Sequence, residues 1–211
     1  MSTICTANLS NLPPPSRLKT VMQSLATLDA IASPEWQYRY YSFNSRWGDR
    51  EMMGSMRSGS GGELFVLFNE AGAFVKGFDH ERWDPGVASR DVYVGVPDCF
   101  GGGVAEPAFS PDHVTFCYWR SNEDARWTAA KVFRGGSNED GSGWMLALLN
   151  GDPASYLSFA RDYYEVEFDA RSVAAICRLV PMSREVAVSL NPTIDYAALL
   201  QDLAEIGYPT D

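Results

Sequence analysis

The stretch ELFVLFNEAGAFVKGF, from Glu63 to Phe78, contains two apolar runs separated by four turn-forming residues. Apolar side chains occupy consecutive positions from Leu64 to Phe68, so both faces of an extended chain there would be apolar. Asn69 and Gly72, at the two ends of the turn, are residue types that tight turns prefer. The stretch therefore predicts a β-hairpin, and strands that are apolar on both faces must be covered on both.

Segments that follow the hairpin repeat this pattern. HVTFCYWR (113–120) and WTAAKVF (127–133) predict a second hairpin across SNEDAR. Phe65, Val66, Leu67 and Trp119 are predicted to be core residues. Between the two hairpins, 79–111 is predicted to be rich in loops, while GDREMMGSMR (48–57) has methionines at helical spacing and predicts a short helical turn.

The most aromatic stretch is PEWQYRYYSFNSRW (34–47), which precedes the first hairpin. Period-two alternation predicts a strand with Trp36, Tyr38 and Tyr40 on its core face. Arg39 and Tyr41 would then share the opposite face. Because a guanidinium is costly to bury alone, Arg39 is expected to pair with an acid or to lie near the surface, with Tyr41 beside it as a cation–π neighbour.

Helices are predicted on both sides of the sheet region. Apolar residues recur at helical period from Leu18 to Leu28, and the helix should end before Pro34. After Gly151, Asp152 is expected to cap the first of several helices, and the last is expected to stop at Gly207. We therefore predict an α+β fold: a mainly antiparallel sheet of about five strands, with an N-terminal helix and a helical C-terminal third packed on it. A single domain, 1–211, is expected to contain these three parts (1–33, 34–135 and 141–207).

The composition restricts the partners. The chain of 211 residues has 27 acidic and 17 basic residues and a formal net charge of −10. Nucleic-acid binding requires a cationic face, so a nucleic-acid partner is not expected, whereas a protein partner with a basic surface would be attracted. No apolar run is long enough to cross a membrane and no secretory signal is evident, so the sequence predicts a cytoplasmic protein without a membrane partner. The sequence does not indicate an oligomeric state.

Several chemistries lack their usual residues. The four cysteines form no CxxC pair, and one of the two histidines, His80, lies between Asp79 and Glu81 on a short segment that cannot supply a metal site alone. The glycines of RSGSGGE (57–63) precede a strand, whereas nucleotide-binding glycine loops follow one. We therefore predict no catalytic residues, no metal site and no cofactor.

A candidate ligand site nevertheless follows from the arginines. If the 34–47 segment and the glycine-rich loop lie side by side, Arg39, Tyr41, Arg57 and His80 could receive an anionic group. A structural ion pair of Arg39 is the favoured alternative to this site.

The strings YRYYSFNSRW, EMMGSMRSGSGGELFVLFN and GFDHE, followed by EPAFS and TFCYWR, resemble an uncharacterised family of soluble bacterial proteins over most of the chain. This resemblance implies no activity. The α+β layout is also similar, at the level of layout alone, to immunity proteins of the SUKH superfamily, which bind and neutralise bacterial toxins.

Two function hypotheses remain from the sequence. The first is a non-enzymatic binding protein, an immunity or regulatory protein that binds another protein. The missing catalytic residues and the many Trp and Tyr residues, which are enriched at binding hot spots, favour it. The alternative is an enzyme or small-ligand-binding protein with an anion pocket near Arg39, Arg57 and His80.

Overall fold

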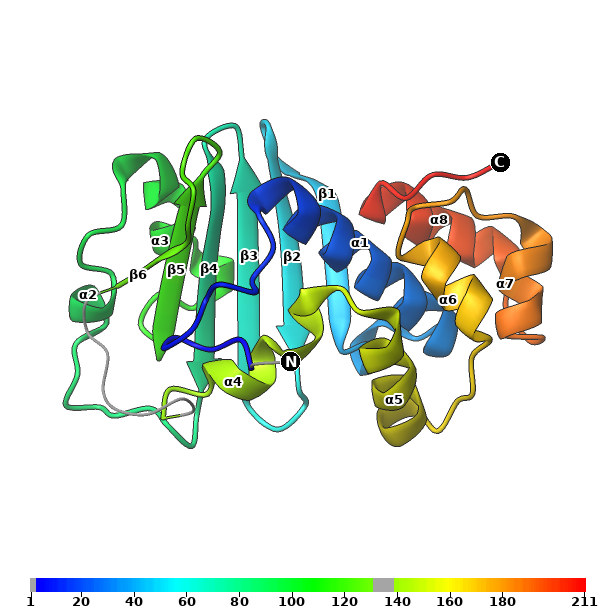
Figure 1. The fold of residues 1–211 in the computed structure, drawn as a ribbon, viewed down its shortest axis with the longest axis horizontal. Coiled ribbons are helices and arrows are strands. Elements are labelled where there is room, and N and C mark those ends of the chain that lie inside the picture. The colour runs from blue at the N-terminus through cyan, green and yellow to red at the C-terminus, as the bar shows by residue number, and fades with distance from the viewer. Residues whose placement is uncertain (1–2, 131–138) are drawn as a thin grey trace.

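The computed structural model describes residues 3–130 and 139–211 of the chain. Within them, six strands form one antiparallel sheet in which every strand pairs with the next in sequence. This confirms the predicted α+β fold and its antiparallel sheet (Figure 1). The last strand is short, and residues 131–133 of the predicted second hairpin lie outside the described residues. The strands are β1 (Tyr41–Gly48), β2 (Glu51–Arg57), β3 (Gly62–Asn69), β4 (Gly72–Asp79), β5 (Phe116–Ser121) and β6 (Thr128–Ala129).

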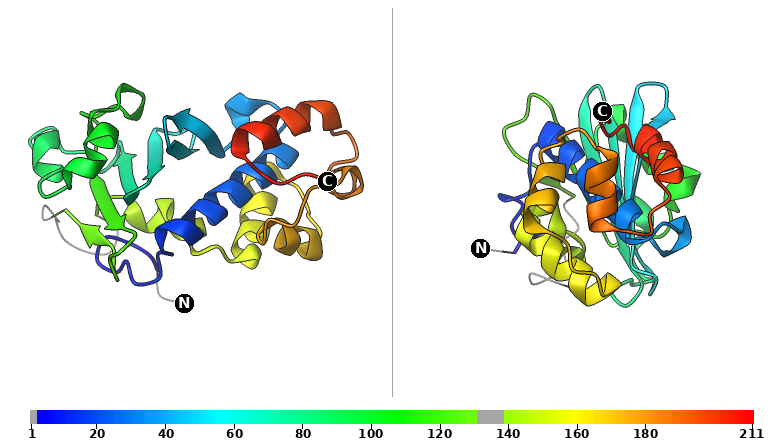
Figure 2. Two further views of the ribbon diagram at one scale, coloured as in Figure 1. Left: turned by 90° about the horizontal axis from the view of Figure 1, so that it is seen from above. Right: turned by 90° about the vertical axis from the view of Figure 1, so that its right-hand side faces the viewer.

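One face of the sheet is covered by the N-terminal helix α1 (Pro15–Ala32), which crosses β1 and β2 (Figure 1). The C-terminal helices gather around α1 and beside β1, as the view from the right in Figure 2 shows. Both packing predictions are thereby confirmed. These elements are α4 (Ser142–Met145), η4 (Ala147–Asn150), α5 (Pro153–Tyr164), α6 (Ala170–Ile176), α7 (Arg184–Leu190) and α8 (Tyr196–Ile206).

The other face is covered by short helical turns, in the region that the sequence predicts to be rich in loops. They are α2 (Ser89–Val92), η2 (Asp98–Phe100), α3 (Gly101–Ala105) and η3 (Pro107–Phe109). Phe65 of β3 stacks on Phe109, with ring centroids 4.7 Å apart. Phe65, Val66, Leu67 and Trp119 are all buried, which confirms them as core residues.

A buried lysine secures this second layer. Lys76 of β4 is buried, and its ammonium donates hydrogen bonds to the carbonyls of Phe109 and Ser110. It also lies 5.6 Å from the centroid of the Phe65 ring. Burial lowers the pKa of Lys76 to about 8. The two carbonyls at the end of η3 thus obtain a donor from the sheet.

Local turn and capping signals are confirmed. The Asn69 side chain accepts hydrogen bonds from the backbone N–H groups of Ala71 and Gly72, closing the first hairpin. Asp152 caps α5 by accepting from the Ala154 N–H. Gly207 ends α8 with a φ of 69°, which glycine adopts without a steric penalty.

The prediction of a helical turn at GDREMMGSMR was wrong. Residues Glu51–Arg57 form β2, which pairs with β1 on one side and β3 on the other. Gly54 lies under α1, where an added Cβ would come within 2.6 Å of Met22 Cε. The hydrogen bonds to two neighbouring strands, which local spacing does not report, outweigh the helical pattern of the methionines.

The strand predicted for Trp36, Tyr38 and Tyr40 was also wrong, and of these three rings only Tyr40 packs against the core as predicted. Residues Trp36–Tyr38 form a 3₁₀ turn, η1, and the strand starts at Tyr41. Trp36 and Tyr38 are 54% and 61% exposed, and Tyr40 is half-buried. Because period-two alternation holds only for extended chain, it wrongly assigned Trp36 and Tyr38 to the core face.

The described helices of the chain differ from membrane-spanning segments. Among those in 3–130 and 139–211, none combines the length and the apolar character needed to cross a bilayer.

Candidate functional site

A groove lies where η1, the start of the glycine-rich loop and the end of α5 meet. Its volume is about 510 Å³. Trp36, Tyr38 and Tyr163 are large rings that remain exposed at its rim, Tyr163 by 43%. We call it the aromatic groove. It is lined by Trp36, Gln37, Tyr38, Arg39, Arg57, Gly59, Tyr163 and Tyr164.

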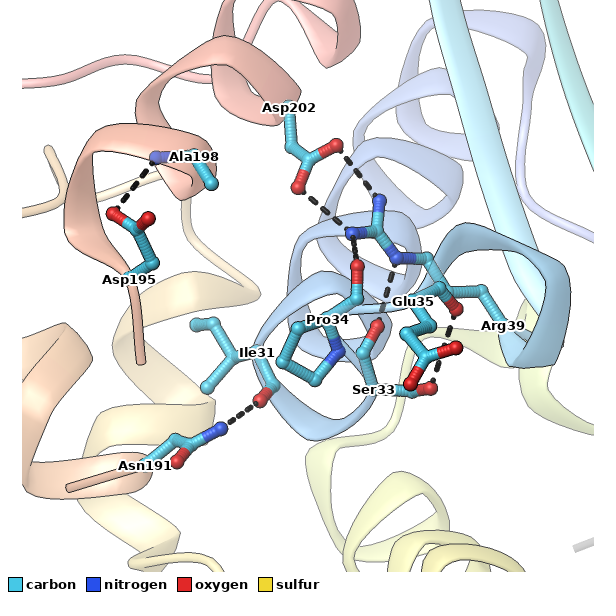
Figure 3. Close-up of polar contacts among 9 residues, drawn as sticks. All are labelled: Ile31, Ser33, Pro34, Glu35, Arg39, Asn191, Asp195, Ala198 and Asp202. Carbon is cyan, nitrogen blue, oxygen red and sulfur yellow. Dashed lines mark hydrogen bonds and ion pairs between the residues drawn. The ribbon is translucent and has the colours of Figure 1, made fainter. Parts of the chain in front are cut away.

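Arg39 holds η1 in place. Its guanidinium forms a two-fold hydrogen-bonded ion pair with Asp202 of α8, at 2.9 and 2.8 Å. The same group donates to the carbonyls of Ser33 (2.9 Å) and Pro34 (2.6 Å), as Figure 3 shows. The Arg39 side chain is 6% exposed, so these contacts are largely shielded from water. The predicted structural ion pair of Arg39 is confirmed, and its donors are largely engaged inside the protein.

Arg57, at the end of β2, is the cation of the groove that has no acidic partner within the described residues. Its guanidinium carbon lies 5.0 Å from the centroid of a Trp36 ring, a cation–π arrangement. Its backbone N–H donates to the carbonyl of Tyr40, which fixes the start of the loop against the end of η1. Within the described residues the Arg57 guanidinium donates no hydrogen bond, so its N–H groups can still donate to a ligand.

The back of the groove rests on a buried carboxyl group. Asp29 of α1 is completely buried and accepts hydrogen bonds from the hydroxyls of Tyr156 (2.7 Å) and Tyr164 (2.8 Å), and from the Tyr41 N–H (2.6 Å). The Tyr164 hydroxyl in turn accepts the Tyr40 N–H. Burial raises the pKa of Asp29 to about 7, although the hydrogen bonds from Tyr41, Tyr156 and Tyr164 oppose the shift.

Ring contacts order this wall: Tyr163 stacks on Phe159 and meets Tyr40 and Tyr164 edge to face. The Tyr163 ring lies 5.1 Å from both Tyr40 and Phe159, and 4.9 Å from Tyr164. Burial raises the pKa of Tyr40 to about 12, so its hydroxyl is neutral at physiological pH. Among the described residues, the groove thus presents aromatic surface with one cation that has no acidic partner, which suits binding better than proton transfer.

The predicted ligand residues are only partly brought together. Arg39 and Arg57 line the same groove. Tyr41 is 1% exposed and does not lie beside Arg39 at the surface, because β1 begins only at Tyr41 and its buried face carries Tyr41 and Phe43. His80 is exposed, and its ring packs against Gly61 of the glycine-rich loop, outside the groove.

None of the sequence patterns indicates that Tyr163, Tyr164 or Asp29 belong to this region. The YY pair at the end of α5 and an aspartate within an apolar helix are the features that could have drawn attention to them.

A second hollow, of about 480 Å³, lies near the start of α1 and the β1–β2 turn. It mixes basic Lys19, Arg46 and Arg50 with acidic Glu51 and Glu70. Arg50 and Glu70 already form an exposed ion pair at 3.1 Å. This partial neutralisation makes it a weaker candidate than the aromatic groove.

The metal-binding and thiol side chains of the described residues form no second candidate site. In the part of the chain that the structure describes, no three His, Cys, Asp or Glu side chains are grouped so as to hold a metal ion. The four cysteines are free thiols, and Cys99 is the exposed one.

Comparison with known proteins adds no family or neighbour: no protein-family model, no curated protein and no solved structure matches this chain. The resemblance to a bacterial family and the likeness to SUKH immunity proteins therefore stay predictions.

Proposed function

We propose that this chain is a non-enzymatic binding protein that recognises another protein through the aromatic groove. The observation that carries the proposal is the exposure of Trp36, Tyr38 and Tyr163 around one groove (54%, 61% and 43%). Exposed rings lose water when a partner covers them, and Trp, Tyr and Arg dominate binding hot spots.

Rigidity of the groove supports the proposal. Arg39 ties η1 to α8, and Asp29 fixes Tyr164 from behind. A surface that is already ordered loses little conformational entropy on binding. A masking role, as in an immunity or regulatory protein, requires only such a surface. A toxin gene beside the gene for this chain would support the immunity role. The cytoplasmic location and the basic surface of the partner stay predictions.

Truncating the groove rings is expected to weaken partner binding by about thirtyfold or more each, because a hot-spot ring contributes about 2 kcal/mol or more. The partner is first captured from source cells with the wild-type chain and identified by mass spectrometry. Calorimetry with the purified partner then compares wild type with Trp36→Ala, Tyr38→Ala and Tyr163→Ala.

Trp83→Ala is the matched control, because Trp83 is also exposed (41%) but does not line the groove. It should bind as wild type does. Wild-type affinity in all three groove variants, or an equal loss in the Trp83 variant, would refute the proposed surface.

A further inference from the structure

The polar groups left free in the aromatic groove are mainly donors. Within the described residues, the Arg57 guanidinium and the Gly59 N–H have no hydrogen bond or ion pair, and neither do the hydroxyls of Tyr38 and Tyr163. Gly59 has a φ of 73° and open space around its Cα, so a ligand can approach its backbone. These groups would complement a hydrogen-bond acceptor.

The charge of the groove differs from that of the chain. The sequence has 27 acidic residues against 17 basic ones, yet the groove is lined by two arginines and, among the described residues, by no carboxylate. Asp202 neutralises Arg39, so within the described residues the groove has one unneutralised charge, the positive charge of Arg57. One guanidinium, which lies over the Trp36 ring, matches one singly charged carboxylate, which it can bind with two parallel hydrogen bonds.

We infer that the aromatic groove takes an acidic side chain of a protein segment, Asp or Glu, whose carboxylate contacts Arg57 and the Gly59 N–H. An apolar neighbour in the same segment would cover Trp36 and Tyr38. The inference rests on the proposed function and names the partner's chemistry. It also replaces the predicted four-residue site, since Arg39 is engaged, Tyr41 is buried and His80 lies outside. Nucleic acid fits poorly because the chain's net charge of −10 repels a polyanion.

The test uses two synthetic peptides, acetyl-Tyr-Glu-Leu-amide and its Gln counterpart, which differ in charge and little in shape. Binding is followed by NMR through the Trp36 indole N–H signal, assigned with Trp36→Phe. We expect the Glu peptide to shift this signal and to bind about tenfold more tightly than the Gln peptide. Arg57→Gln should abolish the difference. Arg90→Gln, which removes the same charge from an exposed residue of α2, should preserve it.

Three results would overturn the inference. They are equal affinity for the two peptides, no shift of the Trp36 signal up to about 10 mM peptide, and tighter binding of inorganic phosphate than of the Glu peptide, which would indicate a small oxyanion as ligand. The fate of the proposed function is separate. If the natural partner is lost with Trp36→Ala but retained with Arg57→Gln, the inference fails and the proposed function stands. If Trp36→Ala, Tyr38→Ala and Tyr163→Ala all leave partner binding intact, the proposed function fails whatever the peptides show.

Discussion

Arg39→Gln is expected to lower the free energy of unfolding by about 1.5–3 kcal/mol, the range for losing hydrogen bonds to a charged group, because Asp202 is 28% exposed and can be hydrated once its cation is gone. The change leaves Asp202 without its cation, and it removes the donors that satisfy the carbonyls of Ser33 and Pro34. Urea unfolding monitored by circular dichroism measures the loss. Because α8 and η1 are joined through this guanidinium (Figure 3), partner binding should also weaken.

Arg50→Gln is the control for this prediction. Its ion pair with Glu70 has both side chains about 70% exposed, and such surface pairs contribute about 0–1 kcal/mol. Arg57→Gln should likewise stay within about 1 kcal/mol of wild type, since it removes one partly exposed cation–π contact. If Arg39→Gln behaved like these two variants, Arg39 would not be a structural residue.

The sequence predicted the parts of the fold that local chemistry determines. Asn69 and Gly72 mark a turn because of their own side-chain and backbone properties. Asp152 and Gly207 mark helix ends for the same kind of reason. The packing of α1 on the sheet follows from one apolar stripe, and the antiparallel pairing from short connections.

The predictions failed where contacts between residues far apart in the sequence determine the local structure. The Trp36–Tyr38 turn depends on Arg39 reaching Asp202, which lies 163 positions away. β2 depends on hydrogen bonds to both neighbouring strands. The groove is lined both by η1 and by Tyr163 and Tyr164 of α5, and no spacing in the sequence predicts that these two segments lie side by side. Arg39 and Arg57 were predictable as a pair because only the β1–β2 hairpin separates them.

The second large effect concerns Asp29. Its pKa is raised from 3.8 to about 7 in the folded protein, chiefly by burial. The folded state therefore holds this proton more tightly than the unfolded state does. The stabilisation is fully present below about pH 4 and is lost as the pH rises through about 7, and three pKa units correspond to about 4 kcal/mol at most.

Asp29→Asn should remove this pH dependence, because the amide stays neutral. Its amino group can donate to the Tyr156 hydroxyl while its oxygen keeps the Tyr41 N–H and the Tyr164 hydroxyl as donors. Unfolding free energies of wild type and variant are compared from pH 5 to 8.5. As the pH rises from 5 to 8.5, the unfolding free energy of the variant should therefore increase relative to that of wild type.

Asp169→Asn provides a control of opposite sign. Asp169 caps α6 at the surface, and hydrogen bonds from Ser172 lower its pKa, so its contribution is lost as the pH falls. Its stability difference from wild type should stay constant between pH 5 and 8.5. If the unfolding free energies of wild type and Asp29→Asn ran parallel between pH 5 and 8.5, the pKa of Asp29 would not be raised by folding.

Since Tyr164 lines the groove and bonds to Asp29, partner binding should survive in Asp29→Asn but weaken in Asp29→Ala, which removes both carboxylate oxygens from behind the ring.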